Sequence, residues 1–69
     1  MSKINVVING NNIELENSSS VAQMLLERSV TGSMFVVEKN REIVQKEDYS
    51  KTPVEQNDVF EIVGFFGGG

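Results

Sequence analysis

The sequence lacks two side chains that often carry protein chemistry, because it contains no cysteine and no histidine, and it has only one proline. Without cysteine, the 69-residue chain has no disulfide, no thiolate metal site and no cysteine nucleophile. Without histidine, it lacks the commonest general base and metal ligand. We therefore expect no metal site, no bound cofactor and no enzyme activity of its own. Stability must come from one apolar core in a single domain, residues 1–69.

Basic residues are also few, with six lysines and arginines against ten aspartates and glutamates, for a net charge of -4. The cations are scattered and form no stripe that could neutralise phosphates, so we expect no nucleic-acid partner. An acidic surface favours a basic protein partner. No apolar run approaches the roughly 20 residues that span a bilayer, and the opening segment is too short and polar for a signal peptide. We expect a cytoplasmic protein with no membrane partner.

Alternating apolar residues predict a β-hairpin over residues 3–16. The first strand, KINVVI, places Ile4, Val6 and Ile8 on one face. The sequence NGNN follows, and Asn-Gly is a strong signal for a tight hairpin turn because both residues accept positive φ. The second strand, NIELE, turns Ile13 and Leu15 inward.

Residues 17–32, NSSSVAQMLLERSVTG, predict a helix of about two to three turns. Ser20 and Gln23 have the spacing of a capping box at its start. Val21, Met24, Leu25 and Arg28 share one face at helical spacing, where the arginine contributes its alkyl stem.

The remaining sequence predicts three more strands, at 34–40, 42–45 and 59–66, separated by a loop that holds one short helical turn. In the last strand Phe60 and Ile62 alternate with Glu61 and Val63, so the first pair faces the core. The order β-β-α-β-β-β predicts an α+β fold, with a mixed sheet of about five strands packed on one helix.

The sequence ends in three glycines, Gly67, Gly68 and Gly69. They are interpreted either as a frayed end or as a flexible functional tail, residues 65–69, whose last residue presents a carboxylate. Such a tail spans about 17 Å when extended, and glycine lets its backbone enter a narrow active site. The carboxylate is a poor electrophile, so a partner must activate it, for example as a mixed anhydride with AMP.

The two phenylalanines before the glycines have different predicted roles. Alternation sends one of Phe65 and Phe66 into the core beside Met34 or Val36. The other ring is then exposed next to the tail, where it can anchor an interface. Val63 and Val7, on the outward face, are predicted to extend this partner-binding patch.

Three parts of the sequence carry a family resemblance: Val36–Tyr49 (VVEKNREIVQKEDY), Asn57–Gly69 (NDVFEIVGFFGGG) and the opening strand–NG–strand. Together they resemble the ThiS/MoaD-like family of ubiquitin-related proteins, and most closely its ThiS branch, the sulfur carriers of thiamin biosynthesis. The resemblance implies the β-grasp, ubiquitin-like fold. It also implies that a pair of terminal glycines enters the active sites of partner enzymes.

The same resemblance implies a reaction sequence. A ThiF-like, E1-like adenylating enzyme uses ATP and Mg²⁺ to convert the Gly69 carboxylate into an acyl-adenylate. Sulfur from a cysteine desulfurase or another persulfide donor then displaces AMP and leaves a thiocarboxylate. A ThiG-like thiazole synthase accepts that sulfur.

Other functions remain open at this point. The chain could carry sulfur for another pathway, as the small subunit of molybdopterin synthase or in tRNA thiolation. It could also be a ubiquitin-like modifier, or an interaction module without terminal chemistry.

Overall fold

The Asn-Gly sequence produces the predicted first hairpin. β1 (Lys3–Ile8) and β2 (Asn11–Glu16) pair antiparallel, from Lys3 opposite Glu16 to Ile8 opposite Asn11. Asn9 and Gly10 form the turn with φ of 50° and 84°, as a two-residue hairpin with this sequence requires. The computed structural model describes residues 3–16, 20–28, 30 and 34–64.

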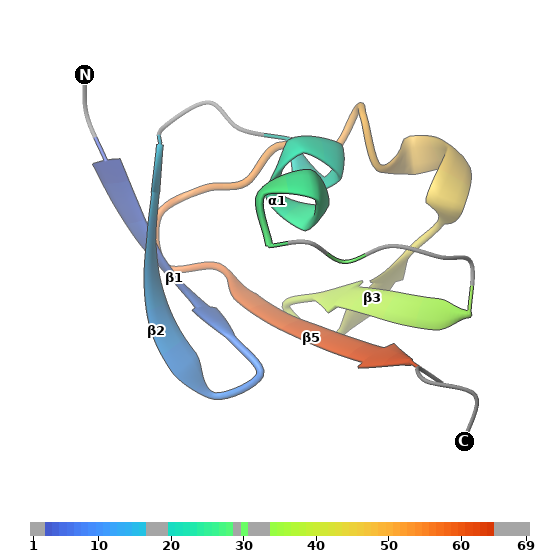
Figure 1. The fold of residues 1–69 in the computed structure, drawn as a ribbon, viewed down its shortest axis with the longest axis horizontal. Helices are drawn as coiled ribbons and strands as arrows, with labels where there is room; N and C mark the ends of the chain where they lie inside the picture. Colours follow the sequence, from blue (N-terminus) through green and yellow to red (C-terminus); the bar gives the residue numbers. More distant parts are fainter. Residues whose placement is uncertain (1–2, 17–19, 29, 31–33, 65–69) are drawn as a thin grey trace.

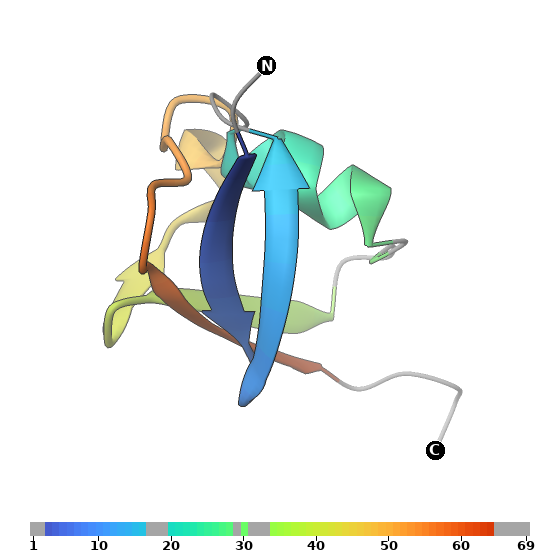
Figure 2. The ribbon, with the colours of Figure 1, turned by 90° about the vertical axis from the view of Figure 1, so that its left-hand side faces the viewer.

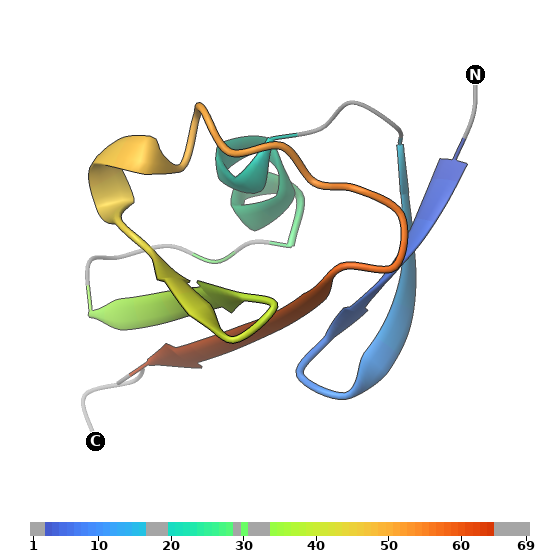
Figure 3. The ribbon, with the colours of Figure 1, turned by 180° about the vertical axis from the view of Figure 1, so that it is seen from behind.

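The last strand lies at the centre of a five-stranded mixed sheet (Figures 1 and 3). The strand order is β2-β1-β5-β3-β4, where the later strands are β3 (Phe35–Lys39), β4 (Glu42–Val44) and β5 (Val59–Gly64). β5 runs parallel to β1 and antiparallel to β3. The predicted α+β fold, with five strands and one helix, is confirmed.

The helix α1 (Val21–Glu27) packs on one face of this sheet and is shorter than predicted (Figure 2). Ser20 Oγ accepts the Gln23 N–H at 3.1 Å, but the Gln23 side chain donates to Glu27, so the reciprocal half of the capping box is absent. The Val30 N–H bonds to Leu25 O, five residues back, so the chain leaves the helical path after Glu27. No helix in the described ranges has the length and apolarity to cross a membrane.

Burial on the helix confirms three of the four residues predicted for its core face. Val21, Met24 and Leu25 are buried. Arg28 is the C-cap and is exposed as a whole residue, but it lines a hollow together with Ile8, Ile13 and Ile62, so it lies toward the same side as the buried residues. Positions 17–19, 29, 31 and 32 of the predicted range lie outside the described residues.

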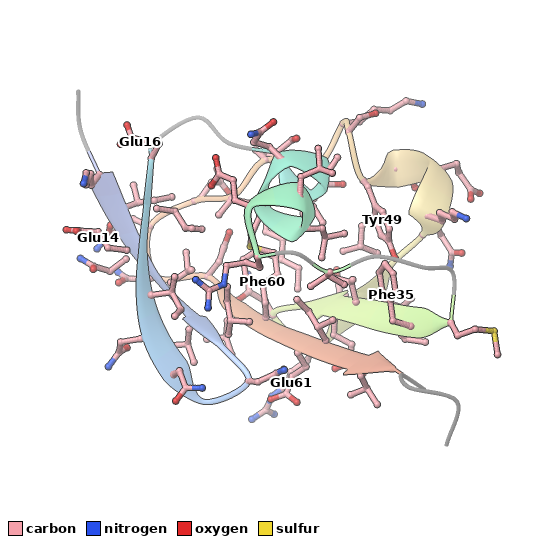
Figure 4. All side chains as sticks on the ribbon, in the orientation of Figure 1. Glu14, Glu16, Phe35, Tyr49, Phe60 and Glu61 are labelled. Carbon is pink, nitrogen blue, oxygen red and sulfur yellow. The ribbon has the colours of Figure 1, made fainter. Side chains whose placement is uncertain are left out.

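The apolar core fills the space between the sheet and α1, and Phe60 of β5 lies at its centre with no exposed surface (Figure 4). The residues that the alternation patterns turned inward on β1 and β5 are all buried, as is Leu15 of β2. The core consists of Ile4, Val6, Ile8, Leu15, Val21, Met24, Leu25, Val37, Val54, Phe60 and Ile62.

The long loop before β5 closes one end of this core. Its predicted helical turn is the 3₁₀ helix η1 (Lys46–Asp48). The loop holds the start of α1, because Thr52 O accepts the Val21 N–H at 2.9 Å and Tyr49 O accepts the Ala22 N–H at 3.0 Å. Burial raises the pKa of Tyr49 above 10.0, and its ring stacks on Phe35 of β3 with centroids 6.2 Å apart (Figure 4).

Asp58 fixes the end of this loop just before β5 begins. It is 6% exposed. Its carboxylate accepts the Glu55 N–H at 2.7 Å and Asn40 Nδ2 at 3.0 Å. Lys39 Nζ lies 3.4 Å from Asp58 Oδ2 and donates to Pro53 O at 2.7 Å. A buried carboxylate with this set of partners is costly to remove, because the part-buried Lys39 ammonium then loses its counter-charge and two part-buried donors lose their acceptor.

We predict that Asp58→Ala lowers the free energy of unfolding by about 3 kcal/mol, because it leaves the Lys39 ammonium without its buried counter-charge. Glu55→Ala is the matched control. It removes the exposed carboxylate at 3.4 Å from the same ammonium, so it should cost less than about 1 kcal/mol. Urea denaturation of both variants measures the difference, and equal losses would contradict this assignment.

Candidate functional site

The central strand β5 sets where the chain leaves the sheet. Its last residue, Gly64, pairs with Phe35 of β3. The predicted tail residues Phe65, Phe66, Gly67, Gly68 and Gly69 follow immediately and lie outside the described residues. The roles of these five residues therefore stay predictions. The structure defines the strand that they follow, β5, and its neighbouring strands.

Apolar side chains gather on the sheet face that points away from α1, here called the outer face. Its members are Val7, Val36, Ile43, Val59 and Val63. Val36 and Val63 lie opposite each other in the β3–β5 register, and Val7 pairs with Val59 between β1 and β5. Val63 and Ile43 are each 61% exposed, whereas Val7 is half-buried. The structure thus places the two predicted patch residues, Val63 and Val7, on one face.

The prediction that one of Phe65 and Phe66 completes the core beside Met34 or Val36 concerns residues outside the described ranges, but the two expected neighbours are not core residues. Val36 is 47% exposed and Met34 is 63% exposed. β3 turns Phe35 and Val37 inward instead, and because neighbours on a strand alternate, Val36 belongs to the outer face.

Two glutamates face each other on the same surface. Glu38 of β3 lies directly opposite Glu61 of β5, and Figure 4 shows Glu61 on the side of β5 away from α1. Within the described part of the chain, neither carboxylate has a cation in salt-bridge range. Like charges directly opposite on a sheet are destabilising. The sequence did not indicate this pair, since it depends on the register between two distant strands.

An open hollow of about 550 Å³ borders the point where β5 ends. It is lined by Asn9 and Gly10 of the first turn and by β5 residues from Glu61 to Gly64. Among the residues that the structure describes, no group of acidic side chains is arranged to hold a metal ion. This region therefore offers an open surface beside the end of β5.

Comparison with known proteins identifies the family. The ThiS family model matches residues 3–69. The chain is 35% identical over 63 residues to the sulfur carrier protein ThiS of Bacillus subtilis (strain 168), which covers 90% of this chain and 96% of that protein. This chain belongs to the ThiS family. The family predicted from the sequence is confirmed, and its members are small sulfur carriers of thiamin biosynthesis rather than catalysts.

A solved ThiS structure extends the likeness to the fold. The crystal structure of the thiamine biosynthesis protein ThiS from Geobacter metallireducens matches with a TM-score of 0.81 and 29% identity, over 96% of this chain and 100% of that chain. The mixed five-stranded sheet with one helix agrees with the predicted β-grasp fold.

The ThiS family chain also matches part of a larger protein. It is 41% identical over 64 residues to a thiazole synthase of Paramagnetospirillum magneticum (strain ATCC 700264 / AMB-1). The match covers 93% of this chain and 20% of that protein, so the chain spans about a fifth of the length of this relative.

We predict that Glu61→Gln stabilises the free chain by about 0.2–1 kcal/mol, because it removes the charge facing Glu38. Glu38→Gln should give a similar gain. The double variant should gain little more than either single one, since both remove the same repulsion. Thermal denaturation of the four proteins measures the coupling, and fully additive gains would contradict a direct Glu38–Glu61 interaction.

Proposed function

We propose that this ThiS family member carries sulfur as a thiocarboxylate on Gly69 and delivers it during thiamin biosynthesis. The main support is that the family match runs through residue 69, only five residues after the end of the central strand. A short glycine-rich segment attached to a rigid strand can extend into the active site of another protein. We further propose that the exchange takes place in the cytoplasm.

The chemistry requires two partner-dependent steps. In the first, an oxygen of the Gly69 carboxylate attacks the α-phosphorus of ATP in a ThiF-like, E1-like enzyme, and pyrophosphate leaves with Mg²⁺. In the second, the terminal sulfur of a persulfide on a cysteine desulfurase or another donor attacks the acyl carbon, and AMP leaves. A thiol then attacks the donor-side sulfur of the resulting acyl disulfide, which releases the thiocarboxylate on Gly69 and leaves a disulfide between the thiol and the donor. The chain itself supplies only the acyl group, and Gly67 and Gly68 supply the backbone that enters the enzyme.

We propose a ThiG-like thiazole synthase as the acceptor of the sulfur. The support is the match between this chain and one fifth of a protein named thiazole synthase. A carrier-like segment within the same polypeptide as a synthase would meet it at a high effective concentration. A separate carrier must instead recognise the synthase through its surface.

The outer face is the proposed docking surface for these partners. Val63 and Val7, together with Phe65 and Phe66, would provide apolar contacts next to the tail. Exposed apolar patches of this kind mark protein interaction sites. The facing carboxylates of Glu38 and Glu61 favour a partner that brings a lysine or arginine to the same surface.

An alanine added after Gly69 tests the proposed terminal chemistry. We predict that this variant folds normally but no longer supports ATP–pyrophosphate exchange by the adenylating enzyme, because the reacting carboxylate is displaced and a methyl group enters the narrow channel. The control carries the added alanine at the amino terminus and should behave as the unmodified chain. Normal exchange by the extended variant would favour an interaction module without terminal chemistry.

Docking on the outer face is tested separately. We predict that Val63→Ser weakens binding to the adenylating enzyme by roughly tenfold, since an interface anchor is worth about 1–2 kcal/mol. Leu26→Ser is the matched control, because Leu26 is similarly exposed, at 70%, but lies on α1. Titration calorimetry measures both affinities. Equal affinities for the two variants would place the interface elsewhere.

A further inference from the structure

The side chain of Asn9 bonds to the backbone of the central strand. Its Oδ1 accepts the Ile62 N–H at 2.8 Å, and its Nδ2 donates to Ile62 O at 3.1 Å. The two residues are 53 positions apart in the sequence. Both bonds are partly buried, so neither is easily replaced by water.

These bonds continue a ladder that the main chain cannot complete. The Val7 N–H bonds to Asp58 O at 2.9 Å, and the Asn9 N–H bonds to Phe60 O at 3.0 Å. The next bond of a parallel ladder would reach Ile62 O, two residues further along β5. However, β1 ends at Ile8 and the chain reverses at the turn. The Asn9 side chain supplies the donor that a further β1 residue would have provided, and the acceptor that its own main-chain carbonyl would have provided in a continuing strand.

A second asparagine holds the opposite end of the same strand. Asn40 lies in the turn between β3 and β4 with φ of 51°, almost the same as the 50° of Asn9. Its Oδ1 accepts the Val59 N–H at 2.9 Å, and its Nδ2 donates to the Asp58 carboxylate at 3.0 Å. Thus Asn40 anchors the beginning of β5, and Asn9 anchors the part of β5 that leads into the tail.

We propose that Asn9 is a positioning residue for sulfur loading, which rests on the proposed function. Its amide holds Ile62 on the side of β5 where β1 has ended, and so fixes the direction in which the chain leaves at Gly64. Beyond Phe60, the main-chain pairs of β5 are with β3 alone. Without the Asn9 amide, the last residues of β5 can shift or fray, and the start of the tail moves with them.

Loss of the Asn9 hydrogen bonds is expected to slow adenylation of the chain more than it weakens binding to the adenylating enzyme. Four members of the outer face, Val7, Val36, Ile43 and Val59, lie outside the end of β5 that Asn9 holds, so the adenylating enzyme still binds. Val63 is the one member that shifts with this strand end. A displacement of about 1 Å at the reacting atoms can cost up to a hundredfold in rate. The expected signature is therefore a fall in kcat that is much larger than the rise in KM.

The test compares Asn9→Gly with Asn40→Gly. Both substitutions remove one amide with two bonds from a residue at positive φ, and glycine keeps that backbone conformation without strain. The probe is the ThiF-like enzyme with Mg–ATP, measured as pyrophosphate exchange, with thermal denaturation of each variant alongside. We expect Asn9→Gly to lower kcat roughly tenfold to a hundredfold with a much smaller change in KM, while Asn40→Gly keeps both values.

Hydrogen exchange gives the direct physical readout. The Ile62 amide should exchange faster in Asn9→Gly than in Asn40→Gly when the two variants are equally stable. Asn9→Asp retains an acceptor for the Ile62 N–H but loses the donor, so its kcat should lie between those of the native chain and Asn9→Gly. If Asn9→Gly does not fold, Asn9→Asp takes its place in the comparison with Asn40→Gly.

Each outcome separates the positioning role from the proposed function. Equal kcat values for Asn9→Gly and the native chain, or an equal loss in both glycine variants, would overturn the role of Asn9 while leaving terminal loading intact. No loading of the native chain would overturn the proposed function, and the positioning role with it.

Discussion

The position of β5 at the centre of the sheet is the constraint on which the rest of the structure depends. This strand pairs with β1 on one side and β3 on the other. Its inward residues, Phe60 and Ile62, belong to the core, and its outward residues, Val59 and Val63, belong to the outer face. The same strand therefore contributes to stability, to the proposed docking surface and to the point from which the tail begins.

This arrangement suits a carrier protein that is bound by enzymes. Members of the ThiS family are sulfur carriers rather than catalysts, and the sequence contains neither cysteine nor histidine. Under the proposed function, the chain offers the acyl group of Gly69 on a segment that begins directly after β5. Asp58 and Asn40 at the beginning of β5, and Asn9 near its end, hold the strand through side-chain hydrogen bonds. A well-held strand reduces the number of positions from which the tail can start, and so lowers the entropy lost when a partner binds it.

Local patterns predicted most of the fold, whereas contacts between distant residues could not be predicted. The Asn-Gly turn, the inward residues of β1 and β5 and the Ser20 cap depend on neighbouring residues, and all were found. The helix was predicted too long because its end depends on the Val30–Leu25 bond. Asn9 was predicted only as a turn residue, since nothing near it in the sequence points to Ile62. The register that brings Glu38 opposite Glu61, and turns Val36 outward, likewise arises only when β3 pairs with β5.

The most direct test of the central claim is the intact mass of the chain after incubation with the ThiF-like enzyme, Mg–ATP, a cysteine desulfurase and cysteine. The account predicts a gain that matches the replacement of one oxygen by sulfur, located on Gly69 after proteolysis. An unchanged mass, with an adenylating enzyme that is active on its own carrier, would contradict it. A gain located on any other residue would contradict it equally.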